Sequence, residues 1–267
     1  MGYGTPPDSR IVIEPEQQQI RAQLRESGLN LYACLDLFSV QAQGIGGVST
    51  VADTAGHYSL VLVGNSGPDF WSACQASSFK TADHPVDEFS AASVLAALAK
   101  YVPETTAQLL YPAPECRVPL QQLGALVGWH QPSPLGTGIH PDWGLWFAYR
   151  ALILVEAGWQ PTEALTPASN VCAECASQAC LQACPPSALS ESAAPDLHAC
   201  ARYRVFGHEN HGGDDAGTAT ESLCATTCLA RCACPVATSQ RYTDDQISHH
   251  YSRALSALRH WVDPKAV

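Results

Sequence analysis

The feature that most constrains the fold of this chain is a concentration of cysteine in its second half. Nine of the twelve cysteines lie between Cys172 and Cys234, and the other three are scattered. From residue 167 to 238 the sequence is rich in Cys, Ala, Ser, Pro and Gly and has little hydrophobic periodicity. Such a segment cannot build a core from side chains alone. The bunched thiols therefore indicate metal ligands, because a bound metal then supplies much of the folding free energy.

The spacing of the cysteines divides them into two groups that both end in Cys-Pro. The first is Cys172-x2-Cys175-x4-Cys180-x3-Cys184-Pro, and the second contains a distant Cys200 followed by CATTCLARCACP from residue 224. Two-cluster bacterial ferredoxins carry the run C-x2-C-x2-C-x3-C-P, whose fourth cysteine binds the other cluster. The first group keeps both ends of that run, with two extra residues between them. The nine predicted metal ligands are Cys172, Cys175, Cys180, Cys184, Cys200, Cys224, Cys228, Cys232 and Cys234.

Two [4Fe–4S] clusters need eight of these nine cysteines, which leaves one of Cys232 and Cys234 spare. By analogy with the ferredoxin pattern, each cluster takes three ligands from one group and one from the other. The first set is Cys172, Cys175, Cys180 and the final Cys-Pro of the second group, and the second set is Cys184, Cys200, Cys224 and Cys228. Paired zinc sites and purely structural thiols remain alternatives, because C-x2-C pairs also occur in four-cysteine zinc sites.

Charge and composition exclude several classes of partner. The chain has 14 Lys and Arg against 25 Asp and Glu, a formal net charge of -11. This balance argues against nucleic acid and against an anionic membrane surface, both of which attract cations. No apolar run is long enough for a membrane span, and the N-terminal MGYGTPPDSRIVIEPEQQQ lacks the pattern of a secretory signal. We expect a cytoplasmic protein, in which disulfides are rare.

Strands and helices alternate before the cysteine-rich segment, which predicts an α/β layer fold. Helices are predicted over 14–27, 65–78, 84–102, 119–129 and 243–262, and strands over 29–40, 59–64, 107–112 and 151–158. Gly28 is predicted to end the first helix, and Thr243 to cap the last.

The segment GIHPDWGLWFAYR (138–150) resembles a motif of the CblC-type cobalamin-processing proteins, I-H-P-x-x-G-x-W-F-A-x-R. The matching residues are Ile139, His140, Pro141, Gly144, Trp146, Phe147, Ala148 and Arg150. GALVGW (124–129), which precedes a similar loop and two cysteine groups, resembles the epoxyqueuosine reductase and reductive dehalogenase family. Weaker similarity to the CblC type extends over about 60–250, for example in RYTDDQISHHY (241–251).

The resemblance implies a nitroreductase-like α/β (α+β) cobalamin-binding domain over 1–166 and a ferredoxin-like [4Fe–4S] subdomain over 167–240. A closing helix over 241–267 would pack back on the first domain. The implied activity is reduction of base-off cobalamin to Co(I), chiefly for removal of its upper ligand, with electrons from a ferredoxin or flavodoxin. Alternatives are a dehalogenase-like or epoxyqueuosine reductase-like enzyme acting on a small organic substrate, and a non-catalytic cobalamin carrier. The expected partners also include a second copy of the chain.

The resemblance also assigns roles to individual residues. Arg150 corresponds to an arginine that binds a thiol co-substrate or shapes the corrin pocket. Cys116 or Glu115 lies near the position of the proton-donating aspartate of epoxyqueuosine reductases. The predicted catalytic residues are Arg150 and Cys116. The predicted cobalamin-binding residues are Ser66, Gly128, Trp129, Gly136, Gly138, Ile139, His140, Trp146 and Arg150. A structural salt bridge remains the alternative for Arg150, and core packing remains the alternative for the tryptophans.

Overall fold

The computed structural model describes residues 14–45, 48, 57–113, 117–165, 170–207 and 222–262. The chain divides into two compact units. The first comprises Met1–His130 and Phe147–Thr166, and the second comprises Gln131–Trp146 and Pro167–Val267. Residues 131–146 and the closing helix belong to the same compact unit as the cysteine-rich segment.

The first unit is built on a four-stranded antiparallel sheet with strand order β1-β2-β4-β3. The strands are β1 (Leu31–Asp36), β2 (Ser59–Ser66), β3 (Ala107–Tyr111) and β4 (Phe147–Val155). The two central strands, β2 and β4, read as nearly continuous apolar runs because side chains on both faces of the sheet are buried. The strands predicted over 59–64 and 107–112 are confirmed, and the one predicted over 151–158 is confirmed as far as Val155 but begins earlier, at Phe147.

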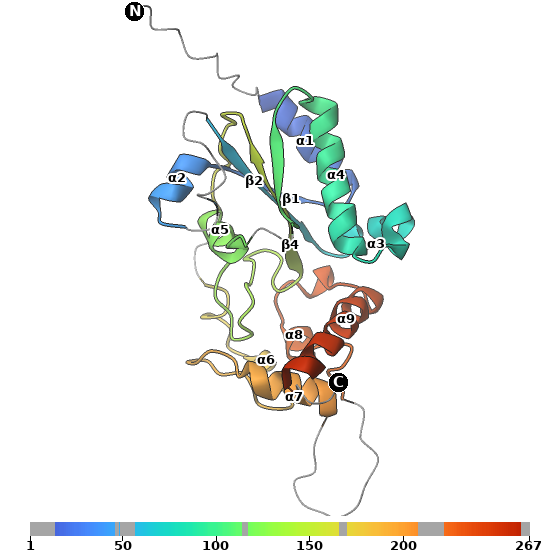
Figure 1. The fold of residues 1–267 in the computed structure, drawn as a ribbon. Coiled ribbons are helices and arrows are strands. Elements are labelled where there is room, and N and C mark those ends of the chain that lie inside the picture. The colour runs from blue at the N-terminus through green and yellow to red at the C-terminus, as the bar shows by residue number, and fades with distance from the viewer. Residues whose placement is uncertain are drawn as a thin grey trace, which may run out of the picture. The chain divides into compact units, whose positions relative to one another are not determined.

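Helices cover both faces of this sheet (Figure 1). Helices α1 (Glu14–Glu26), α3 (Asp69–Ala76) and α4 (Pro85–Tyr101) pack on one face, and α2 (Leu37–Ala42) and α5 (Leu120–Leu126) lie on the other. The 3-10 helix η1 (Ser78–Thr81) joins α3 to α4. The core under α1 and α4 contains side chains such as Ile20, Leu24, Val61, Val94 and Ile153. The helices predicted for α1, α3, α4 and α5 are therefore confirmed.

The strand predicted over 29–40 is wrong after Asp36. The Asp36 carboxylate accepts a hydrogen bond from the Ser39 amide at 2.8 Å and thereby caps the N-terminus of α2. Aspartate at this position favours a helix start over continuation of a strand, and Leu37 and Val40 are buried from that helix.

The second unit has little regular structure. It contains α6 (Ala179–Gln182), α7 (Leu197–Phe206), α8 (Leu229–Ala233), η2 (Thr238–Gln240) and α9 (Asp244–Val262). Helix α7 packs on α9, and α6 packs on α8. The Thr243 hydroxyl accepts from the Gln246 amide at 3.2 Å, which confirms the predicted cap of the last helix. Among the described residues, no helix combines the length and apolar character that a membrane crossing requires.

Candidate functional site

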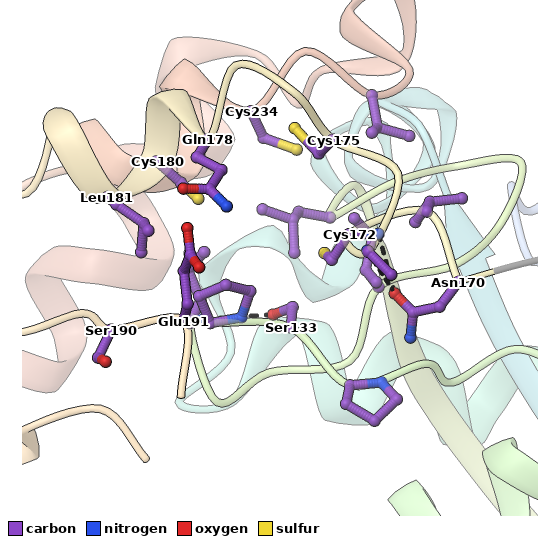
Figure 2. Close-up of a pocket in the computed structure, with 18 of the residues that line it drawn as sticks. Ser133, Asn170, Cys172, Cys175, Gln178, Cys180, Leu181, Ser190, Glu191 and Cys234 are labelled. Carbon is purple, nitrogen blue, oxygen red and sulfur yellow. Dashed lines mark hydrogen bonds between the residues drawn. The ribbon is translucent and has the colours of Figure 1, made fainter. Parts of the chain in front are cut away.

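Four cysteines line one cavity of about 540 Å³ within the second unit (Figure 2). Cys172, Cys175 and Cys180 belong to the first cysteine group, and Cys234 is the residue that caps the C-terminus of α8. These are the four side chains that the ferredoxin analogy predicts as one ligand set. The spare cysteine of the pair, Cys232, does not line this cavity.

Two amide side chains hold the start of the first cysteine group. The Asn170 side-chain oxygen accepts hydrogen bonds from the amides of Cys172 (2.9 Å) and Ala173 (3.1 Å). The side-chain oxygen of Gln131 accepts from the Val171 amide at 3.0 Å. These bonds fix the backbone at Cys172 and therefore the direction in which its side chain leaves it. Neither Asn170 nor Gln131 was identified from the sequence. Asn170 has a recognisable signal, because an asparagine side chain often accepts a hydrogen bond from the backbone two residues later and so forms a turn.

The thiols around the cavity perturb one another. The pKa of Cys172 is raised to about 11, chiefly by burial and in smaller part by the neighbouring Cys234, Cys180 and Cys175. Burial and the same neighbours also raise the pKa of Cys180. These groups therefore hold protons at neutral pH, and binding of a metal to their thiolates must release those protons.

The remaining predicted ligands form a second group within the same unit. Burial is the largest cause that raises the pKa of Cys200, and the charges of Cys228, Cys184 and Cys224 raise it further. Cys200 lies on α7, while Cys228 caps α8 and its sulfur accepts from the Arg231 amide at 3.4 Å. Cys184, Cys200, Cys224 and Cys228 thus lie near one another, although they come from three separate segments of the sequence.

Cys232 has different neighbours. Its sulfur lies 3.6 Å from the Thr227 hydroxyl, and its side chain packs beside Trp146 and Tyr242. It does not line the cavity, and it is not among the thiols whose charges act on Cys200.

Within the described residues, no three His, Cys, Asp or Glu side chains lie close enough to share a single metal ion. An iron–sulfur cluster is wider than one ion, and its thiolates bind to different iron atoms. Thiolates are also the soft ligands that such clusters take. In number and chemistry, two groups of four thiols fit two [4Fe–4S] clusters.

The first unit buries an arginine. Arg150 on β4 is only 7% exposed. Its Nε donates to the side-chain oxygen of Asn65 at 2.6 Å, and its guanidinium lies 4.8 Å from the centre of the Phe70 ring. Among the described residues Arg150 forms no ion pair, so the structural salt bridge is not seen there. A buried guanidinium is suited to an anionic ligand.

Three other predicted cobalamin-binding residues of the first unit have structural contacts of their own. The Ser66 amide and hydroxyl both donate to the side-chain oxygen of Asn30, at 2.8 and 3.1 Å. Gly128 has a φ of 77°, a conformation that favours glycine, and it approaches the backbone of Leu165 closely. Trp129 is 5% exposed and stacks on Tyr149. Their roles in binding cobalamin remain predictions.

The other predicted cobalamin-binding residues belong to the second unit. Ile139 packs in a small core with Leu145 and Cys234, next to Cys172, and Trp146 packs with Tyr242. Gly136 has a φ of 71° and lies beside Pro195, and Gly138 is half-buried. The predicted catalytic residue Cys116 lies outside the described residues.

The His140 ring is buried and neutral. It is 1% exposed, and its Nδ1 accepts from the Asp142 amide at 3.1 Å. Burial is the larger influence and lowers its pKa to about 4, although the Asp142 carboxylate acts in the opposite direction. An imidazole in this state can accept or donate hydrogen bonds at neutral pH but carries no charge.

This burial predicts a pH-dependent stability. An unfolded histidine titrates near pH 6.5, so between pH 6.5 and about 4 the unfolded chain binds a proton that the folded chain does not. The contribution of neutral His140 to the free energy of unfolding is complete above pH 6.5. It declines as the pH falls, by at most about 3 kcal/mol. His140→Asn, which keeps an acceptor for the Asp142 amide, is expected to remove this part of the pH dependence. Urea unfolding at pH 7 and pH 5 measures it, and equal losses of stability in both proteins would contradict the prediction.

No protein-family model matches the sequence, and no curated protein matches it. Solved structures do match. The B12-trafficking protein CblC of C. elegans aligns with a TM-score of 0.50 and 14% identity over 95% of this chain and 98% of that chain. A reductive dehalogenase whose structure suggests a mechanism for B12-dependent dehalogenation aligns with a TM-score of 0.51 and 12% identity. That alignment covers 97% of this chain and 37% of the dehalogenase.

This chain has a nitroreductase-like fold of the CblC and dehalogenase type. The predicted fold class is therefore confirmed. At such low identity the likeness concerns the fold alone. An epoxyqueuosine reductase bound to a tRNA stem loop aligns at a TM-score of 0.49 and 11% identity, which is too low to support an inference.

Proposed function

We propose that this protein is a cobalamin-associated iron–sulfur reductase. The observation that carries the proposal is the gathering of eight cysteines into two groups of four within one unit of a nitroreductase-like chain. CblC is described as a B12-trafficking protein, and the similar dehalogenase is described with B12-dependent chemistry. The fold therefore supports a corrinoid as the substrate, and the thiols support a route for electrons.

In this proposal the clusters are held by the two groups as the structure arranges them. Cys172, Cys175, Cys180 and Cys234 hold one cluster, and Cys184, Cys200, Cys224 and Cys228 hold the other. When bound, the clusters accept and pass on single electrons, and cobalamin reduced to Co(I) is a strong nucleophile. Asn170 and Gln131 orient the first ligand, and Ile139, Leu145 and Val236 keep water from one side of the cavity.

Arg150 is proposed to bind the anionic group of a co-substrate or of cobalamin itself. Asn65 fixes the guanidinium through its Nε, and Phe70 stacks against it, which orients the group for an anion. Because the guanidinium is largely buried, an anion there gains more than it would from a solvated arginine.

The finer activity that we propose is removal of the upper ligand of cobalamin after reduction by a ferredoxin or flavodoxin. The experiment adds cob(II)alamin, and then a low-potential reductant, to anaerobically prepared protein and to the same protein stripped of iron. We expect both samples to shift the cobalamin spectrum to the base-off form, and only the iron-loaded sample to form Co(I). Binding without reduction would support a carrier instead, and an unperturbed cobalamin spectrum would refute the proposal.

A further inference from the structure

Helix α7 places a fixed cation beside the second cysteine group. Arg204 lies one helical turn after Cys200, so both side chains project from the same face of α7. Its Nε donates to the carbonyl of Cys224 at 3.2 Å, and a terminal nitrogen donates to the carbonyl of Tyr251 at 2.9 Å. The guanidinium also lies 4.8 Å from the centre of the Tyr251 ring. These contacts fix the cation between two cysteines of one group.

A second arginine contacts this group through its backbone, whereas its guanidinium is directed elsewhere. The Arg231 amide donates to the sulfur of Cys228 at 3.4 Å. Its guanidinium donates to the carbonyl of Leu145 and lies over the rings of Trp146 and Tyr242.

The first cysteine group has the opposite environment. Apart from the cysteines, the only ionisable side chain among the described residues that line its cavity is Glu191. Figure 2 shows Glu191 pointing into the cavity, on the side of Gln178 and Cys180. The other lining side chains are apolar or neutral, with Pro132, Leu135 and Val236 among them.

This difference has a consequence for electron transfer, because reduction adds one negative charge to a cluster. A nearby cation stabilises the reduced state, whereas a nearby carboxylate destabilises it. We propose that the cluster bound by Cys184, Cys200, Cys224 and Cys228 has the higher reduction potential of the two, and that Arg204 is the residue that sets this difference. The inference rests on the proposed presence of both clusters.

The two potentials would determine where a single electron resides within the unit. One electron supplied by a ferredoxin or flavodoxin donor would reside mainly on the cluster held by Cys184, Cys200, Cys224 and Cys228, because a higher potential favours reduction. No bond would form or break and no proton would be required.

The test is a potentiometric titration, followed by electron paramagnetic resonance, of the full chain with its clusters. Arg204→Gln removes the charge, and Arg204→Lys keeps it. Arg202→Gln is the matched control, because Arg202 lies on the same helix and stacks on Phe206 instead. We expect Arg204→Gln to shift the higher of the two midpoint potentials downward and to leave the lower one in place. Arg204→Lys should retain most of the wild-type value, and Arg202→Gln should change neither potential.

Several outcomes would overturn the inference. Among them are a shift of the lower potential, an equal shift of both, or no shift in Arg204→Gln. If Arg204→Gln loses a cluster, the midpoint potentials of Arg204→Lys and Glu191→Gln provide the test instead. Arg204→Lys must keep the higher potential, and Glu191→Gln must raise only the lower one. Wild-type protein that contains no iron would refute the proposed function itself, which keeps the two failures distinct.

Discussion

Replacing Cys180 with alanine is expected to lower bound iron from about eight to about four atoms per chain. Cys180 lines the cavity with Cys172, Cys175 and Cys234, so its loss leaves that cluster with three thiolates. Cys184→Ala should remove a similar amount of iron from the other cluster, because Cys184 lies near Cys200 and Cys224. Iron and acid-labile sulfide, measured after anaerobic purification, test both variants.

The neighbouring pair Cys232 and Cys234 provides a matched control. The two residues are separated by one position, yet only Cys234 lines the cavity, and Cys232 packs beside Trp146. Cys234→Ala should lose about four irons, whereas Cys232→Ala should keep about eight. The opposite pattern would show that the ligand sets are assigned wrongly, and full iron in Cys180→Ala would exclude its cavity as a cluster site.

The second large effect is expected at Gly28, which ends α1 with a φ of 72°. A Cβ atom there would lie 2.3 Å from the Phe70 amide nitrogen and 2.4 Å from the Phe70 Cα. The obstacle is backbone of α3, which cannot rotate away as a side chain could. Gly28→Ala should therefore destabilise the first unit by about 3 kcal/mol or more, from the left-handed conformation and the steric clash together.

Substitution of Gly44 measures the conformational cost without the steric clash. It has the same φ of 72°, but a Cβ atom there would meet nothing within 4 Å. Gly44→Ala should therefore destabilise the protein only by the conformational term, about 1 to 2 kcal/mol. Thermal and urea unfolding followed by circular dichroism measure both variants. Equal losses of stability would mean that the contact between Gly28 and α3 has little effect.

The parts of the fold with strong local signals were predictable. Residues 84–102 have helical periodicity, and 59–64 and 151–158 are short apolar runs of the kind that central strands show. The strand order β1-β2-β4-β3 was not predictable, because it depends on pairing between segments far apart in the chain. Helix α7 was missed because its alternating Cys, His, Arg and Tyr residues give no apolar periodicity.

The candidate site divides in the same way. Cysteine spacing is a local signal, and it predicted groups that the structure brings near one another. The residues that support the site carry no such signal, because their partners are distant in the sequence. Asn65 binds Arg150 across 85 positions, and Arg204 binds the Tyr251 carbonyl across 47. Only Asn170, two residues before Cys172, had a sequence signature that could have been used.

The most direct test of the account is the metal content and absorption spectrum of anaerobically purified wild-type protein. If the protein holds two [4Fe–4S] clusters, we expect about eight irons and an equal amount of acid-labile sulfide per chain. We also expect a broad visible absorption that bleaches when a low-potential reductant is added. Zinc in place of iron, with no visible absorption to bleach, would contradict it and would leave a zinc-stabilised binding module.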